Sequence, residues 1–130
     1  MRYDMNMSPY SYKSRMLALG LLLWVLGTLA IRLVGHRVLH AHQAVQTLIL
    51  YALSFVVMGL LVRRIVQPLQ RDLRPAAATL LMLPTLILDP FSCAFFPAIF
   101  PNIEPAAAGV FGGWMLIFCA GAVAGVWIWR

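Results

Sequence analysis

Hydrophobic residues form four long runs along the chain, and the polar stretches between them are short. The runs cover residues 16–34, 44–62, 76–96 and 106–129. Each is 19 to 24 residues long, and a helix needs about 20 apolar residues to cross the ~30 Å hydrocarbon core of a bilayer. The connections of 9, 13 and 9 residues suit neighbouring antiparallel helices. We therefore predict an all-α integral membrane protein with four antiparallel transmembrane helices, in which a tail over residues 1–15 precedes one membrane domain over residues 16–130.

The composition supports this prediction and excludes an ordinary soluble domain. Hydrophobic residues make up 62% of the 130-residue chain and charged residues 11%, whereas a soluble domain averages about 45–50% apolar and about 25% charged. The net charge of +6 would suit nucleic acid in a soluble protein, but the basic residues here flank the hydrophobic runs. The expected partner is therefore the lipid bilayer and not a nucleic acid. Cys93 and Cys119 form no CxxC or zinc pattern, and no metal or cofactor is predicted.

Basic residues lie mostly on one side of the predicted bundle. That side carries Arg2, Lys13, Arg15, Arg63, Arg64, Arg71, Arg74 and Arg130. The other side carries only Arg32 and Arg37. Because short loops rich in lysine and arginine stay in the cytoplasm, this positive-inside pattern predicts cytoplasmic termini and a cytoplasmic tail, in a multi-pass protein of a bacterial inner membrane.

Arg32 and Asp89 are charged residues in stretches that otherwise read as membrane spans. A charge in hydrocarbon costs roughly 3 kcal/mol on insertion scales, so it normally faces a partner, a wet cavity or the boundary. Counted from residues 16 and 76 at about 1.5 Å per residue, Arg32 lies about 24 Å and Asp89 about 20 Å along its helix. Matched depth and opposite sign favour an ion pair. Two alternatives stay open. In the first, Arg32 reaches the outer headgroups and Asp89-Pro90 ends a short third helix. In the second, a protonated Asp89 belongs to a transport pathway.

Prolines crowd the end of the third run and the loop that follows it. They are Pro84, Pro90, Pro97, Pro101 and Pro105. Proline removes a helical hydrogen bond and crowds the preceding turn, so we predict that the third helix is broken or irregular at its outer end. The loop is apolar and should fold back onto the outer mouth. Asn102 and Glu104 then lie at the rim, either as contacts for a ligand or partner or as part of a rigid cap.

Histidines in the first external loop are further candidates at this outer mouth. His36 and His40 have the i, i+4 spacing that can bind a metal on a helix. No cysteine or carboxylate within the loop completes a metal site. We therefore predict contacts with lipid headgroups, a ligand or a partner at these positions.

The fourth hydrophobic run contains two GxxxG patterns. Their glycines are Gly109, Gly113, Gly121 and Gly125. Small residues allow helices to approach closely in lipid. The pattern predicts helix packing, either inside the bundle or with a protein partner or a second copy.

Several short motifs resemble those of a family of small four-helix bacterial membrane proteins classed as a domain of unknown function. They are Leu22-Leu23-Trp24, Gly27-Thr28, Arg32, Leu88-Asp89, Phe91-Ser92, Phe96-Pro97, Phe100-Pro101-Asn102 and Phe111-Gly112-Gly113-Trp114. The resemblance covers residues 16–125. It implies a four-span fold and no particular activity.

Motifs of enzymatic chemistry are missing from the sequence. There is no GxSxG, Walker loop, HExxH or dinucleotide fingerprint. The pattern favours a non-enzymatic membrane protein that acts as an accessory or partner-binding subunit. The first alternative is a small transporter or channel that uses Arg32 and Asp89. The second is a membrane enzyme that acts on a lipid or isoprenoid substrate near Asn102 and Glu104.

Overall fold

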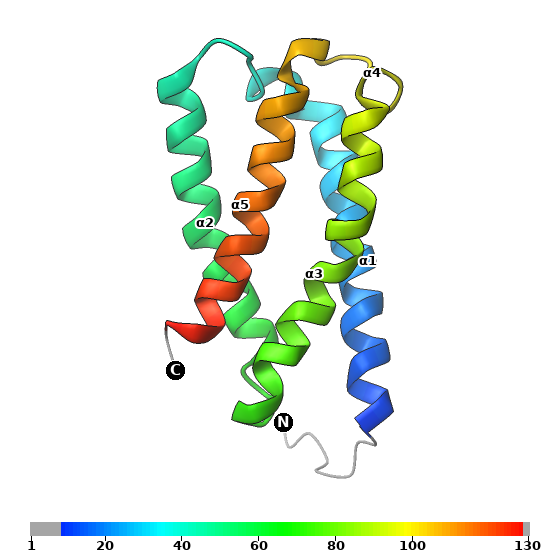
Figure 1. The fold of residues 1–130 in the computed structure, drawn as a ribbon, viewed down its shortest axis with the longest axis vertical. Helices are drawn as coiled ribbons and strands as arrows, with labels where there is room; N and C mark the ends of the chain where they lie inside the picture. Colours follow the sequence, from blue (N-terminus) through cyan, green and yellow to red (C-terminus); the bar gives the residue numbers. More distant parts are fainter. Residues whose placement is uncertain (1–8, 129–130) are drawn as a thin grey trace.

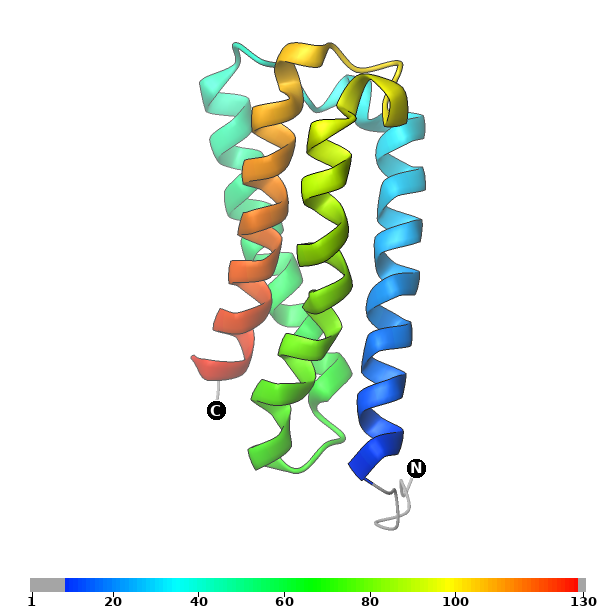
Figure 2. The ribbon, with the colours of Figure 1, turned by 45° about the vertical axis from the view of Figure 1, so that its right-hand side comes forward.

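The computed structural model describes residues 9–128 of the chain, with side chains from residue 11 onward. Four long helices dominate it (Figures 1 and 2). The elements in order are α1 (Pro9–Val34), η1 (Gly35–Arg37), α2 (Ala44–Val66), η2 (Arg71–Leu73), α3 (Arg74–Ala94), α4 (Phe96–Ile99), η3 (Pro105–Ala107) and α5 (Ala108–Trp127). The described part of the chain contains no strand, so the all-α fold class is confirmed.

The four long helices are each long and apolar enough to cross a membrane. The spanning segments are Ser11–Arg37, Ala44–Val66, Arg71–Ala94 and Pro105–Trp127. Large aliphatic side chains cover their outer surface; Leu33, for example, is 73% exposed and Leu48 is 68% exposed. Such a surface is too costly to hydrate and matches hydrocarbon. The protein is therefore a membrane protein with four helical spans.

The helices alternate in direction, so both ends of the described chain lie at the same end of the bundle (Figure 1). We call this the termini end, and the connection between α2 and α3 also lies there. The connections between α1 and α2 and between α3 and α5 lie at the opposite end.

Two of the three main helix contacts join helices that are not consecutive in the chain. α1 packs on α3, α2 packs on α5, and α3 packs on α5. By contrast, α2 has few contacts with α3, and α1 barely touches α2. The two outer pairs are therefore parallel, and only the central pair α3 and α5 is antiparallel. The short connections predicted antiparallel neighbours. This holds for α3 and α5, whereas the connections on either side of α2 join helices that hardly pack, because 9 to 13 residues are enough to cross the end of such a small bundle.

Helix α1 begins seven residues before the start of the first hydrophobic run. Residues 9–15, which the sequence assigned to the tail, are helical. The reason is that this extension contributes Tyr12, which is 7% exposed and belongs with Met16, Val62 and Ala77 to the core cluster at the termini end.

Prolines shape α3 without interrupting it. Pro75 lies in its first turn, where a missing N–H costs little, and the helix continues through Pro84 and Pro90. Its direction changes near the middle (Figure 1), as expected at an internal proline such as Pro84. The helix ends at Ala94 and is followed by the single turn α4. The predicted irregular outer end is therefore confirmed, although it begins at Phe95 and not at Asp89-Pro90.

The proline-rich connection folds back into the bundle at the end opposite the termini. Phe96, Phe100 and Phe111 form a cluster with ring centroids 5.1–5.6 Å apart. Leu39 from the α1–α2 connection and Ile103 are buried in the same cluster. This apolar cap fixes the two connections against each other.

Candidate functional site

A cleft of about 430 Å³ lies among the four long helices. Leu26 and Gly27 of α1 and Leu61 of α2 contribute to its walls, together with Thr85 of α3 and Phe118 of α5. Since α1 and α2 barely touch, these two helices face each other across the cleft while α3 and α5 form its floor. A volume of 300–1,000 Å³ is typical of small-molecule sites. We call it the Asp89 cleft, after the one ionisable residue among its described lining residues.

Asp89 is held at the floor of this cleft by a tryptophan. Its side chain is 7% exposed, and its Oδ1 atom accepts a hydrogen bond of 2.9 Å from the indole Nε1 of Trp24. Its Oδ2 atom is buried and has no hydrogen-bond partner among the described residues. A buried polar atom without a partner is costly. The floor of the cleft therefore contains a buried carboxyl group whose second oxygen lacks a donor among the described residues.

The local structure explains why Trp24 meets Asp89. Trp24 lies 15 residues after the first residue of α1, and Asp89 lies 15 residues after the first residue of α3. At about 1.5 Å per residue, both are about 22 Å along two parallel helices. Close approach is possible because Gly20 faces the backbone oxygen of Leu81, where a Cβ atom would overlap. The bond therefore joins positions at equal depth in a tightly packed pair.

Aromatic side chains form much of the cleft wall. Trp114 donates a hydrogen bond of 2.7 Å from Nε1 to the hydroxyl of Ser54 on α2, and its ring lies 5.3 Å from that of Phe118. Tyr51 donates a second bond of 2.7 Å from α2 to the carbonyl of Val110 on α5. These contacts fix the α5 wall of the cleft. Aromatic faces beside a carboxyl form an environment that attracts an organic cation.

Arg32 is not part of this site, and the structure forms no ion pair between Arg32 and Asp89. Arg32 is exposed, and Trp24 is the hydrogen-bond donor to the Asp89 carboxyl. Arg32 lies about 80° around the helix from Trp24, and Ile31, which is nearly in phase with Trp24, is buried instead. The depth estimate failed because the helices begin before residues 16 and 76, by seven and two residues respectively, and because depth alone ignores helical phase.

The outer-mouth candidates do not converge on one site. Glu104 accepts a hydrogen bond of 2.7 Å at Oε1 from the backbone N–H of Ala41, which ties the two connections together. Nε2 of His40 lies 3.3 Å from the carbonyl oxygen of Arg37. His36 and Asn102 are exposed. None of these residues lines the Asp89 cleft, and no group of three metal-binding side chains occurs in residues 9–128.

The glycines of α5 face different surroundings. A Cβ atom at Gly113 would overlap the Tyr51 hydroxyl, one at Gly121 would lie 2.5 Å from the carbonyl oxygen of Phe55, and one at Gly125 would overlap the Gly59 carbonyl. Gly109 has nothing within 4 Å. Three of the four therefore lie against α2 of the same chain. A second copy would have to displace α2 to use this face.

The hydrogen-bonding roles of Trp24 and Trp114 were not predicted from the sequence, where these residues entered only through the family resemblance. Their position within the hydrophobic runs could have indicated these roles. Tryptophan in membrane proteins is enriched at the interface, whereas these two lie well inside their runs. An indole N–H in hydrocarbon needs an acceptor, and the polar residues Ser54 and Asp89 at the same depth are the acceptors that it finds.

Comparison with known proteins identifies a family for this chain but no individual relative. The model of a family of unknown function, DUF5367, matches residues 38–129. This segment includes α2, α3 and α5, and with them Asp89. No curated protein and no solved structure matches the chain.

Proposed function

This chain belongs to the DUF5367 family of unknown function, and we propose that it is a non-enzymatic membrane protein that binds a lipophilic amine in the Asp89 cleft. The observation that carries the proposal is the Oδ2 atom of Asp89, which is buried beside an apolar cleft without a partner. A ligand with a hydrocarbon body fits the apolar walls. An ammonium group on that body satisfies the free oxygen and compensates the carboxylate charge.

The cleft chemistry favours an amine over other apolar molecules. A charged hydrogen bond contributes about 1.5–3 kcal/mol, more than a neutral one, and the indole faces of Trp24 and Trp114 add cation–π attraction. A hydrocarbon without a donor leaves Oδ2 unsatisfied. Acid–base or nucleophilic catalysis normally needs at least two cooperating groups, and Asp89 is the single ionisable group among the described residues of the cleft.

Binding can be measured with decylamine, decanol and decane as probes. The protein is placed in phosphatidylcholine nanodiscs with Trp127→Phe and Trp129→Phe, so that Trp24 and Trp114 report by fluorescence. We expect saturable binding of decylamine, weaker binding of decanol and only unsaturable partitioning of decane. Asp89→Asn keeps an acceptor for Trp24 but removes the charge, and should weaken decylamine binding at least about ten-fold.

The matched control is Arg32→Gln, which also removes one charge but alters an exposed residue outside the cleft. It should leave decylamine binding unchanged. Identical decylamine curves for the unsubstituted protein and Asp89→Asn would overturn the proposal. Saturable decanol binding that survives Asp89→Asn would instead assign the cleft to a neutral alcohol.

A transporter that uses Asp89 is a second candidate, favoured by the position of this buried acid at the floor of the cleft that separates α1 from α2. Buried acids within membrane spans often belong to proton or ion pathways. This function requires flux of decylamine or protons across liposomes, abolished by Asp89→Asn in folded protein. Binding without flux would leave the first proposal standing alone. An accessory role in a larger complex stays a prediction, tested by co-purification.

We also infer that the termini end faces the cytoplasm of a bacterial inner membrane. Six described basic residues lie near that end and two near the other: Lys13, Arg15, Arg63, Arg64, Arg71 and Arg74 against Arg32 and Arg37. This excess supports the orientation through the positive-inside rule.

A further inference from the structure

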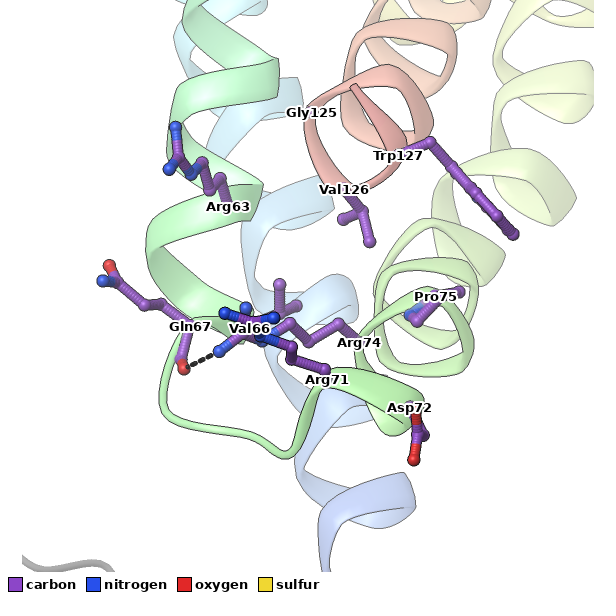
Figure 3. Close-up of a pocket in the computed structure, with 10 residues that line it drawn as sticks. All are labelled: Arg63, Val66, Gln67, Arg71, Asp72, Arg74, Pro75, Gly125, Val126 and Trp127. Atoms are coloured by element: carbon purple, nitrogen blue, oxygen red, sulfur yellow. Dashed lines mark hydrogen bonds between the residues drawn. The ribbon is translucent and has the colours of Figure 1, made fainter. Parts of the chain in front are cut away.

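A second cleft, of about 720 Å³, lies at the termini end. It is formed where α2 ends, η2 and α3 begin, and α5 ends (Figure 3). Its floor includes Val66 and Val126, which are 1% and 8% exposed. Arginines surround this apolar floor, so we call it the arginine cleft. It shares no lining residue with the Asp89 cleft.

The charge of the arginine cleft is strongly positive. Among its described lining residues are three cations, Arg63, Arg71 and Arg74, and one acid, Asp72, so these side chains together have a net charge of +2. The side chains of Arg71 and Arg74 extend toward the end of α2, whereas the carboxylate of Asp72 points away from them (Figure 3). The carboxylate of Asp72 therefore does not neutralise the guanidinium groups of Arg71 and Arg74.

Hydrogen bonds within the α2–α3 connection hold one of these arginines in place. Arg74 donates from Nε to the carbonyl of Leu69 at 3.0 Å and from Nη2 to the carbonyl of Gln67 at 2.8 Å. These bonds use carbonyl acceptors, so the positive charge of the guanidinium is not cancelled. Arg71 is exposed on η2 beside it. The connection therefore presents fixed positive charge to whatever enters the cleft.

The position in the membrane indicates what can enter. Val66 and Trp127 are the last residues of two spanning helices, so the cleft opens at the level of the lipid headgroups. Trp127 is 53% exposed at its edge, as is common for tryptophan at this level. Basic pockets between spanning helices suit phosphorylated headgroups, and guanidinium groups bind phosphate oxygens in pairs. We propose that the arginine cleft binds a phosphate group, as carried by an anionic membrane lipid.

Lipid retention measured by native mass spectrometry tests this site on the full-length protein. Dioleoylphosphatidylglycerol and dioleoylphosphatidylcholine are titrated into the detergent-solubilised protein, and the fraction with bound lipid is recorded. We expect phosphatidylglycerol to bind more tightly. Arg71→Gln should weaken its binding about five-fold, the loss typical of one basic residue near anionic lipid.

Arg64→Gln is the matched control, because Arg64 is also an exposed arginine near this end but does not line the cleft. It should change binding less than two-fold or so. Since Arg71 and Arg64 are both exposed, neither substitution should alter helicity or the unfolding midpoint. Equal losses in the two variants, or equal affinity for the two lipids, would overturn the proposal.

Inorganic phosphate is the third probe and distinguishes the source of the phosphate group. Failure of phosphate to displace phosphatidylglycerol assigns the cleft to a lipid headgroup, and full displacement assigns it to the free anion. Phosphatidylglycerol and phosphate contain no ammonium group, and the trimethylammonium group of phosphatidylcholine has no N–H to donate to Asp89. The loss of phosphatidylglycerol binding in Arg71→Gln is therefore independent of the function proposed for the Asp89 cleft.

Discussion

At the scale of single residues, the defining feature is a carboxyl group that has one donor for two oxygens. Trp24 satisfies Oδ1 of Asp89, and Oδ2 has no partner among the described residues. A second tryptophan, Trp114, instead donates to a serine hydroxyl. The two indoles thus make comparable hydrogen bonds between helices. If either indole is substituted, however, a different acceptor loses its donor. Ser54 can turn its hydroxyl to a backbone carbonyl of its own helix, whereas a carboxyl cannot find a new donor in this way.

This difference predicts unequal effects of two similar substitutions. Trp24→Phe should lower the free energy of unfolding by about 1–2 kcal/mol, because it leaves both Asp89 oxygens without a donor. Trp114→Phe should lower it by less, about 0.5 kcal/mol beyond the shared loss of ring area. Unfolding by sodium dodecyl sulfate in mixed micelles, followed by circular dichroism, measures both. A loss for Trp114→Phe that equals or exceeds the loss for Trp24→Phe would contradict the assigned role of Trp24.

At the scale of helices, two parallel pairs are joined through a central antiparallel contact. Glycines make both parallel contacts close: Gly20 lets α1 approach α3, and Gly121 and Gly125 let α5 approach α2. Lipid tails are as apolar as leucine, so hydrophobic burial gives little preference for helix contacts, and association depends on close packing and hydrogen bonds. The glycines and the tryptophan hydrogen bonds therefore select which helices pair.

A pair of alanine substitutions on α5 tests this selection. Gly125→Ala places a methyl group against the backbone of Gly59 and should lower the free energy of unfolding by about 1–3 kcal/mol through overpacking. Gly109→Ala adds the same group where nothing lies within 4 Å, and should change stability by less than about 0.5 kcal/mol. The same micelle titration provides the values. Equal stability of the two variants would contradict this prediction, because it would show that α2 and α5 can move apart at Gly125 without loss of stability.

At the scale of the molecule, the helices form a curved row in the order α2, α5, α3, α1. The ends of the row, α1 and α2, enclose the Asp89 cleft. At one end of the bundle, the apolar cap and the bond from Ala41 to Glu104 hold the α1–α2 and α3–α5 connections together. The arginine cleft lies at the other end, with the termini. The two ends of the bundle therefore differ: one is closed by a buried apolar cap, whereas the other is rich in basic residues and contains an open cleft.

This asymmetry makes the orientation measurable with single cysteines. In a Cys93→Ala and Cys119→Ala background, Gln43→Cys in the α1–α2 connection should react with a membrane-impermeant maleimide added to intact bacterial cells. Gln70→Cys in the α2–α3 connection should react only after the membrane is permeabilised. The reason is that the arginine-rich connection stays in the cytoplasm. The reverse labelling pattern would place the arginine cleft on the outer face.

The sequence by itself determined that the chain lies in a lipid bilayer, that its spans are helices, and that there are four of them. Four runs of about 20 apolar residues can satisfy their backbone groups in hydrocarbon only as helices, and proline spacing was enough to predict an irregular end for the third helix. The glycines of the fourth run also identified a packing face. These features follow from local sequence, because length and composition decide whether a helix can span a bilayer.

Only the tertiary structure decided which helices are neighbours and which residue meets Asp89. The parallel pairing of α1 with α3 depends on the fit of Gly20 to Leu81 and on the Trp24 bond, which link residues more than 60 positions apart in the chain. Depth estimates suggested Arg32 as the partner, but helical phase turns Ile31 and Trp24 toward the bundle and Arg32 toward the surface. A charged residue within a predicted span indicates that its side chain needs a polar partner. Which residue becomes that partner depends on how the helices pack in three dimensions.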